Sequence, residues 1–287
     1  MTEMATDLRN FWLNEGYILV RGLFSPERTE QLGSICEEIL QQWYCKNPET
    51  GEPGGNPDAV SMRHLNHPGY FAHAPESLNF FMDAVADDAV IETCRTILDE
   101  PPLFRCTTLF MNPTKNSQDG NWHRDSQFLY PDESEEKNLF AGAHSNGGGI
   151  QMQIALVPSD DSEIVPGSHR RWDTAAEYKI RKAAKGANNR SNDMPGALRL
   201  ALQPGDAFAF NAFGLHRGRY HADKKRRTLM LTYTRTSTPS YDYFSHQPWF
   251  AEANYMANFQ PKTRSFFEPF VSAYREEWQK MGASYTA

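Results

Sequence analysis

Residues 121–128 read Asn-Trp-His-Arg-Asp-Ser-Gln-Phe and place His123 two positions before Asp125. In an extended segment, side chains two residues apart point to the same side, so this imidazole and this carboxylate can converge on one point. A metal bound there needs a further ligand from a distant part of the chain, and His216 is the best candidate. Alone, a His-x-Asp triplet is a weak signal, because an Asp cap beside a solvated His gives the same pattern.

The stretch lies inside a part of the chain that is rich in short strands. Three amphipathic helices are predicted ahead of it, at residues 5–15, 26–43 and 77–98. A strand and then an irregular loop interrupt these helices, at residues 17–20 and 45–68. Beyond Pro101, apolar and β-branched runs divided by Pro, Gly and Asp predict strands at residues 103–111, 150–157, 198–202, 207–212 and 228–234. A solvated acidic loop, a polar insertion with a helical first half and a closing helix are expected at residues 132–137, 172–194 and 265–280.

Helices first and strands afterwards predict a mainly β protein with flanking helices. For so many short strands the simplest closure is a double-stranded β-helix, the jelly-roll core that cupins also have. No internal repeat or linker divides the chain, so we expect one domain over residues 1–287. Within it we expect a helical part to about residue 100, the jelly-roll core over about 101–236 and a C-terminal extension over 237–287.

Composition and charge exclude several classes of protein. Hydrophobic residues make up 39% of the 287 residues, which is enough for a folded core. The net charge of −7 argues against a general nucleic-acid binder, which carries a basic surplus. The four cysteines form no Cys-x-x-Cys pair, and the first residues are polar rather than an apolar leader. No apolar run is long enough to cross a bilayer. We therefore expect a cytoplasmic protein without nucleic-acid or membrane partners.

The second half of the expected site lies around His216. A turn at residues 204–206, Pro-Gly-Asp, precedes a strand that leads to His216, and a basic stretch follows before the next strand. Two histidines and one carboxylate on one face of a metal leave the opposite positions open, which is typical of non-haem Fe(II) oxygenases. An arginine at the mouth of the last strand could point into the barrel beside the metal. Its planar fork would match a carboxylate such as the distal one of 2-oxoglutarate.

These residues carry a resemblance to the phytanoyl-CoA dioxygenase-like family of Fe(II)/2-oxoglutarate-dependent oxygenases. The matching pieces come in the family's order: the opening at residues 15–25, Trp122-His-Arg-Asp125, Pro166-Gly-Ser-His-Arg170, Pro204-Gly-Asp206 ahead of His216, and Arg227. The resemblance implies a jelly-roll core, Fe(II), 2-oxoglutarate and O2. It also implies oxidation, usually hydroxylation, of a C–H bond of a small-molecule substrate with release of succinate and CO2.

Carried over by position, the resemblance implies that His123, Asp125 and His216 bind the iron. It also implies that Arg227 binds the C5 carboxylate of 2-oxoglutarate. Arg226 is a competitor for that role, because side chains alternate along a strand and only one of the two neighbours can face inward.

Three more polar residues are candidates for hydrogen bonds to the co-substrate. Thr107 lies on the strand before the His-x-Asp motif, and Asn121 lies two residues before His123. Gln153 is central in an apolar strand, where an unpaired buried amide is costly, so it should face the cavity or be satisfied by a partner.

The substrate is less well defined by the sequence. Arg124, Gln127 and Phe128, next to the motif, are candidates for substrate contacts. Further candidates for recognising an anionic or polar group are Arg217, Arg219 and the loop that carries Arg63, His64 and His67. A solvated basic rim is the alternative interpretation of these arginines, and ordinary core packing is that of the aromatic side chains.

Three other functions remain open at this point. One is a cupin-like metalloenzyme that does not use 2-oxoglutarate, and another is a catalytically silent jelly-roll binding module. The third is a structural zinc site, which would normally be closed by a fourth protein ligand. By the resemblance, the carboxylate of Asp125 argues against a halogenase, where a small residue takes this position. His169, in the Pro-Gly-Ser-His turn, is interpreted as structural.

Overall fold

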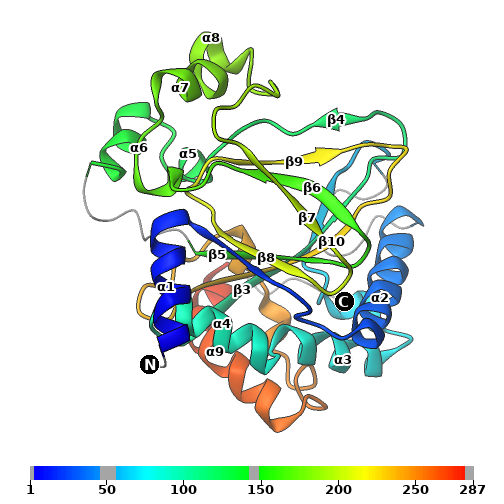
Figure 1. Cartoon of the computed structure of the whole chain (residues 1–287). Coiled ribbons are helices and arrows are strands. Elements are labelled where there is room, and N and C mark those ends of the chain that lie inside the picture. The colour runs from blue at the N-terminus through cyan, green and yellow to red at the C-terminus, as the bar shows by residue number, and fades with distance from the viewer. Residues whose placement is uncertain (1–2, 46–55, 142–148, 282–287) are drawn as a thin grey trace.

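Two antiparallel β-sheets face each other in the computed structural model, which describes residues 3–45, 56–141 and 149–281 (Figure 1). In these residues the large sheet has the spatial order β1 (Tyr17–Val20), β8 (Ala207–Asn211), β5 (Ile150–Ala155), β10 (Arg227–Arg235), β3 (Pro102–Met111) and β2 (Ser61–Arg63). The small sheet has the order β4 (Gln118–Asp119), β9 (His216–Tyr220), β6 (Ser159–Ile164) and β7 (Leu198–Leu202). A mainly β fold with flanking helices is therefore confirmed.

Helices cover the side of the large sheet that faces away from the small sheet (Figure 1). The longer ones are α1 (Glu3–Glu15), α2 (Pro26–Cys45), α3 (Pro75–Val85), α4 (Asp88–Leu98) and α9 (Pro261–Lys280). Short helices gather at one end of the small sheet: α5 (Ser126–Leu129), α6 (Glu133–Leu139), α7 (Ala175–Arg181) and α8 (Ala183–Gly186). The described residues also form short 3₁₀ helices: η1 (Pro68–Phe71), η3 (Ser168–Arg170), η4 (Tyr243–Ser245) and η5 (Pro248–Ala251).

Alternation along the strands separates two apolar layers. On β10, Leu229, Leu231 and Tyr233 pack into the main core under the helices. Phe208 and Phe210 of β8 point the other way, into a smaller cluster between the two sheets. Because successive side chains of a strand face opposite sides, the even-numbered residues of β8 and β10 line the barrel interior.

Most of the predicted elements are present. The strands at residues 17–20 and 198–202 match β1 and β7, and the other predicted strands and the closing helix differ from the structure only at their ends. Pro26 begins α2, as the Ser-Pro-Glu sequence predicts. The loop predicted over residues 45–68 lies partly outside the described residues, and its end forms β2 and the turn that follows.

Two local predictions are wrong. The helix predicted over residues 77–98 is two helices, because Asp87 caps the second one by accepting a hydrogen bond from the Ala89 N–H. The acidic segment at 132–137 is not a loop: Asp132 accepts hydrogen bonds from the first amides of α6. In both cases an aspartate is the N-cap of a helix.

Strands β6 and β9 were not predicted from the sequence, because their outward side chains are charged. Glu163 of β6 accepts hydrogen bonds from Arg217 and Arg219 of the neighbouring β9. A strand whose outward face carries paired charges lacks the apolar run by which strands are recognised. These two strands bring His216 to the site.

The first hundred residues are not only helical, because β1 and β2 extend the large sheet at its two edges. The division into three parts within one domain stays a prediction. None of the helices in the described residues is both long and apolar enough to span a bilayer.

Candidate metal centre and active site

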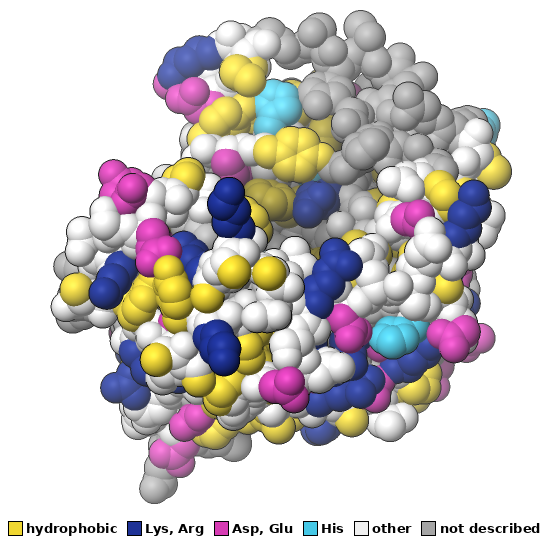
Figure 2. Space-filling view, turned by 90° about the horizontal axis from the view of Figure 1, so that it is seen from above, with side chains coloured by type: hydrophobic (Ala, Val, Ile, Leu, Met, Phe, Trp, Pro, Cys, Tyr) yellow, Lys and Arg dark blue, Asp and Glu magenta, His cyan; other side chains and the backbone are white. Residues whose placement is uncertain are grey.

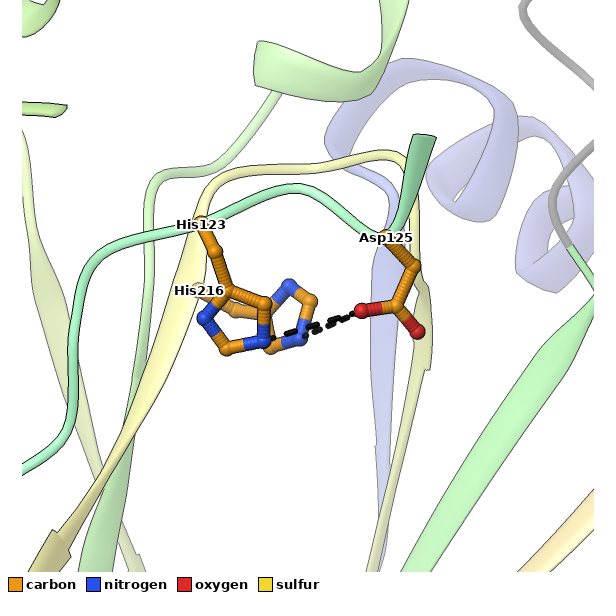
Figure 3. A group of neighbouring side chains, drawn as sticks. All are labelled: His123, Asp125 and His216. Atoms are coloured by element: carbon orange, nitrogen blue, oxygen red, sulfur yellow. Dashed lines mark ion pairs between the residues drawn. The ribbon is translucent and has the colours of Figure 1, made fainter. Parts of the chain in front are cut away.

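His123, Asp125 and His216 converge at one end of the barrel (Figure 3). The Nε2 atoms of His123 and His216 lie 3.6 and 3.8 Å from Oδ1 of Asp125. The two imidazole rings have their centroids 4.2 Å apart. The structure thus brings together the three residues that the sequence analysis predicted as ligands, from two segments far apart in the chain.

The backbone holds these two segments against each other. The N–H of His123 donates to the carbonyl of His216, and the N–H of His216 donates to the carbonyl of His123, at 3.1 and 3.0 Å. The N–H of Asp125 donates to the carbonyl of Ala212 at 2.9 Å. The ligands therefore sit on a short antiparallel pairing rather than on independent loops.

Both histidines are oriented in the same way. Nδ1 of His123 lies 2.7 Å from the carbonyl oxygen of Asn121, and Nδ1 of His216 lies 2.9 Å from that of Gly214. A ring nitrogen that donates to a carbonyl leaves Nε2 with its lone pair free for a metal. Burial and the neighbouring His123 lower the pKa of His216 to about 4, so its ring is neutral at pH 7.

The carboxylate of Asp125 is fixed by a residue that the sequence analysis did not predict. Nε2 of Gln151, on β5, donates to Oδ2 of Asp125 at 2.6 Å. This leaves Oδ1, the oxygen nearest to both imidazoles, free to bind a metal. The available signal was a second glutamine, two residues before Gln153, on the same face of an apolar strand.

The geometry fits an iron ion with open positions. Nitrogen and oxygen ligands bind divalent transition metals at about 2.1 Å, so two ligands of one ion are at most about 4.2 Å apart. The distances to Asp125 satisfy this limit, and the ligand atoms of all three residues lie within 4.8 Å of one another. Within the described part of the chain no fourth His, Cys, Asp or Glu joins the group, unlike in a closed structural zinc site.

Comparison with known proteins agrees with this geometry. The sequence model of the phytanoyl-CoA dioxygenase (PhyH) family matches residues 12–228. This chain belongs to the PhyH family. The matched segment contains both halves of the His–Asp–His group. No curated protein matches the chain significantly by sequence.

Solved structures are similar in fold. AviO1 from Streptomyces viridochromogenes Tue57 has a TM-score of 0.57 at 16% identity, covering 84% of this chain and 100% of that one. EctD from S. alaskensis with bound Fe has a TM-score of 0.56 at 17% identity, covering 87% of this chain and 82% of that one. The non-haem α-ketoglutarate-dependent epimerase SnoN from nogalamycin biosynthesis has a TM-score of 0.54 at 15% identity, covering 81% of each chain. These likenesses confirm the jelly-roll core.

PhyH enzymes use Fe(II), 2-oxoglutarate and O2, and this chain has the intact group of ligands. The protein is therefore a 2-oxoglutarate-dependent oxygenase of the PhyH family, with Fe(II) as its metal and 2-oxoglutarate and O2 as co-substrates. The oxidative outcome is a separate question, because its structural neighbours include an epimerase and the carbocyclase SnoK.

The expectation that Arg227 faces the barrel interior is wrong. Its guanidinium lies on the outer face of the large sheet, where it donates to Glu37 of α2 and to Asn112. Arg226 points inward instead and is 1% exposed, with its guanidinium carbon 5.2 and 4.7 Å from the ring centroids of Phe110 and Tyr220. Because side chains alternate along the strand, Arg226 and not Arg227 faces the barrel interior.

The Arg226 side chain contacts β9 three residues beyond the metal ligand His216. Its Nη1 donates to the carbonyl of Arg219 at 3.0 Å. A Cβ atom on Gly218 would lie 2.8 Å from that same nitrogen and 2.6 Å from the hydroxyl of Tyr220. Gly218 is therefore the second residue that the sequence analysis missed: its missing side chain makes room for the guanidinium.

The predicted co-substrate contacts of Thr107 and Asn121 do not face the site. Thr107 Oγ1 donates to Asn66 among the helices outside the large sheet. The Asn121 side chain is exposed and accepts from Arg190, so only its backbone carbonyl serves the site. Gln153 faces the interior, where its amide oxygen accepts a hydrogen bond from Ser162 Oγ at 2.6 Å.

Of the three residues next to the motif that were predicted to contact the substrate, one borders the site and two do not. Arg124 is fully buried and points away from the metal ligands; it donates to Asp173 and to the carbonyls of Ser168 and Phe213. It is a structural link between the two ligand segments. The carbonyl oxygen of the Gln127 side chain accepts from Arg181. Only Phe128 borders the site: it is 67% exposed and its ring centroid lies 5.9 Å from that of His123.

The remaining basic candidates are also placed elsewhere. Arg217 and Arg219 pair with Glu163 on the outer face of the small sheet. His64 and His67 are buried against Trp249. His169 is structural, as expected, since it is buried and its Nε2 lies 3.3 Å from the carbonyl of Leu13.

Proposed function

We propose that this oxygenase hydroxylates a C–H bond of a small-molecule substrate. One oxygen atom of O2 enters the substrate, and 2-oxoglutarate is converted to succinate and CO2. The observation that carries the proposal is the pairing of two features in one barrel. The open His–Asp–His group lies at one end of the interior, and the buried Arg226 donates to β9, the strand that carries His216.

In this proposal His123, Asp125 and His216 hold the iron through Nε2, Oδ1 and Nε2. When bound, the iron supplies the activation of O2 and the removal of hydrogen from the substrate. The chain's own contribution is orientation. Gln151 holds the second oxygen of Asp125 at 2.6 Å, and two backbone carbonyls fix the imidazoles. Three protein ligands leave positions for a keto acid and for O2.

Arg226 binds the distal carboxylate of 2-oxoglutarate in this scheme. Its guanidinium lies beside Gly218, two residues along β9 from His216. Residues two apart on a strand are about 7 Å apart, a span that a five-carbon diacid can bridge between iron and guanidinium. Arg226 stacks on two aromatic rings, which excludes water and strengthens its interaction with an anion.

Hydroxylation and a small-molecule substrate go beyond what family membership gives. The carboxylate ligand Asp125 is present, so we do not propose halogenation. The neighbouring structures bind small molecules, nogalamycin RO in the case of SnoN and 5-hydroxyectoine in the case of EctD. Phe128, exposed next to His123, is the side chain that we propose to contact the substrate.

The first experiment is an anaerobic titration of the apoprotein with Fe(II) and then 2-oxoglutarate, followed by visible spectroscopy. A weak metal-to-ligand charge-transfer band is expected, because the keto acid chelates the iron. Two variants form a matched pair: Arg226→Gln removes the inward guanidinium and Arg227→Gln the outward one. Each charge-assisted hydrogen bond contributes about 1.5–3 kcal/mol, so Arg226→Gln should weaken 2-oxoglutarate binding at least about tenfold.

Iron binding should persist in both variants, and Arg227→Gln should bind 2-oxoglutarate like the wild type. Loss of the band in Arg227→Gln alone would refute the assignment of Arg226. A protein that binds iron without forming the band would favour a cupin-like enzyme or a silent module. Unchanged metal content in both His123→Ala and His216→Ala would contradict the metal site itself. Under O2, a product heavier by one oxygen atom distinguishes hydroxylation from other oxidations.

A further inference from the structure

Arg63 is a half-buried arginine that faces the barrel interior, and no carboxylate of the described residues pairs with it. It ends β2 and pairs in register with Thr108 of β3. Its neighbour Met62 packs into the core on the helix side, so alternation turns Arg63 to the interior side. Its guanidinium makes no ion pair or hydrogen bond with any other described residue, and its carbon lies 5.4 Å from the ring centroid of Phe244.

Arg105 provides a contrast on the same ring. Its guanidinium carbon lies 5.1 Å from the Phe244 centroid, but it pairs with Asp242. Of the two arginines stacked on Phe244, only Arg63 therefore keeps its charge and its five donors available.

Thr108, directly opposite Arg63, has an unsatisfied hydroxyl. Its side chain is 1% exposed, and its Oγ1 has no hydrogen-bond partner among the described residues. A buried hydroxyl without a partner is energetically unfavourable, which favours a ligand atom that accepts its hydrogen bond. Cross-strand neighbours have Cβ atoms about 5 Å apart, so this hydroxyl and the Arg63 side chain start from adjacent positions on the same face of the sheet. Two sets of donors without an acceptor form a site for an anion.

This pair lies midway along the barrel, two residues along the sheet from the level of Gln151, because Thr108 pairs with Met230 and Met230 pairs with Gln153. Phe244 belongs to η4, which follows the end of β10. Near that end of β10, Thr232 pairs in register with Gln151, the residue that donates to Asp125. Arg63 and Asp125 therefore face the same interior from different strands. Figure 2 shows a face of the molecule hollowed near its centre, with hydrophobic and Lys or Arg side chains visible in the hollow.

The co-substrate does not account for this second cation. Under the proposed function, on which this inference rests, 2-oxoglutarate places one carboxylate on the iron and the other on Arg226. Arg226 contacts β9 of the small sheet, whereas Arg63 lies on the edge strand of the large sheet. We propose that Arg63 and Thr108 form an anion subsite that binds a carboxylate group of the substrate.

A carboxylate fits better than a phosphate. One guanidinium balances a single negative charge and matches the two oxygens of a carboxylate in its planar fork. A phosphate monoester carries about −1.5 to −2 charges at pH 7 and would need a further cation. The neighbouring Phe244 ring suits an apolar body attached to the carboxylate.

The test uses benzoate as a probe, with benzamide as its neutral counterpart and phenyl phosphate as the alternative anion. The anaerobic enzyme loaded with Fe(II) and 2-oxoglutarate is titrated with each probe. The readout is the relaxation of the probe's protons by the paramagnetic iron, which reports binding near the metal. We expect benzoate to bind in the low millimolar range and at least about tenfold more tightly than benzamide.

Arg63→Gln should abolish the preference for benzoate, and Arg63→Lys should keep part of it. Arg170→Gln is the matched control for the loss of one positive charge. Arg170 also has no carboxylate partner among the described residues, but it is exposed and donates to Asn14. The charge-transfer band should form in all three variants, which shows that the fold and the proposed function are intact.

Three results would overturn the inference while that band is present. One is equal affinity for benzoate and benzamide, and another is no benzoate binding at about 20 mM, far above the affinity of a preformed site. The third is benzoate preference that survives in Arg63→Gln. Tighter binding of phenyl phosphate than of benzoate would overturn the choice of carboxylate. Absence of the band in the wild type would instead be a failure of the proposed function.

Discussion

Replacing Gln151 by leucine tests how the carboxylate ligand is held. The substitution keeps the size of the side chain and removes the N–H that donates to Oδ2 of Asp125 at 2.6 Å. A hydrogen bond to a charged group contributes about 1.5–3 kcal/mol. Loss of a residue that orients a metal ligand typically costs 10–100-fold in affinity, about 1.4–2.8 kcal/mol, so two independent estimates agree. We expect Gln151→Leu to weaken Fe(II) binding by about 10–100-fold.

Gln153→Leu is the matched control. Gln153 lies on the same face of the same strand, but its amide oxygen accepts from Ser162 and it does not touch Asp125. Both variants lose one interior amide, so any general effect on the barrel should be common to them. The assay is an anaerobic competition for Fe(II) between the protein and a coloured chelator, without 2-oxoglutarate. If the two variants bind Fe(II) within about twofold of each other, less than 0.5 kcal/mol apart, Gln151 does not orient the ligand.

Three further perturbations have defined outcomes. Gly218→Ala should push the Arg226 guanidinium aside and raise the dissociation constant of 2-oxoglutarate about tenfold with iron binding unchanged; equal affinity in a titration of the charge-transfer band would contradict this. Arg124→Met removes a buried partner of Asp173 and should lower the free energy of unfolding of the metal-free protein by about 3–5 kcal/mol in chemical denaturation; a loss below about 1 kcal/mol would show that the link is dispensable. Burial lowers the pKa of His169 to about 4 from 6.5, so the unfolded chain takes up a proton first as pH falls. Its contribution should decrease from pH 6.5 toward 4, by about 2 kcal/mol at pH 5, and a pH dependence of unfolding that is identical in His169→Gln would refute it.

The ligand group was predictable because its information is local. His123 and Asp125 are fixed relative to each other by two peptide units, and His216 follows a turn and a strand that the sequence marks clearly. The residues that support these ligands were not predictable in the same way. Gln151 meets Asp125 only because β5 lies beside the motif in the folded barrel, and no spacing in the sequence encodes that neighbourhood.

Arg124 shows the opposite error, in which a local feature was given too much weight. A charged residue between two metal ligands suggests a substrate contact, but alternation turns it away from the ligands and into the protein. There it meets Asp173 and two backbone carbonyls, and stacks with its guanidinium carbon 4.8 Å from the Phe140 ring centroid. Its partners lie in the Pro-Gly-Ser-His turn, in an insertion and in the loop before His216, so only the tertiary structure shows that the charge is satisfied.

The choice between Arg226 and Arg227 depends on the same alternation, and the sequence of β10 contains enough to make it. Leu229, Leu231 and Tyr233 share the odd-numbered face with Arg227, whereas Thr228 and Thr232 share the even-numbered face with Arg226. Helices bury the more apolar face of a sheet, so the odd-numbered side must lie under them.

A slip of one residue would exchange the two arginines. It would also remove Leu229 and Leu231 from the main core under the helices and drive Thr228 and Thr232 into that core. Each buried Leu contributes about 1.5–3 kcal/mol, so the hydrophobic pattern enforces the register by several kcal/mol. Arg227 then pairs with Glu37 and ties α2 to the sheet, while Arg226 is held in the barrel. The packing of the helices thus decides which arginine is available to the co-substrate, and resemblance in spacing alone cannot.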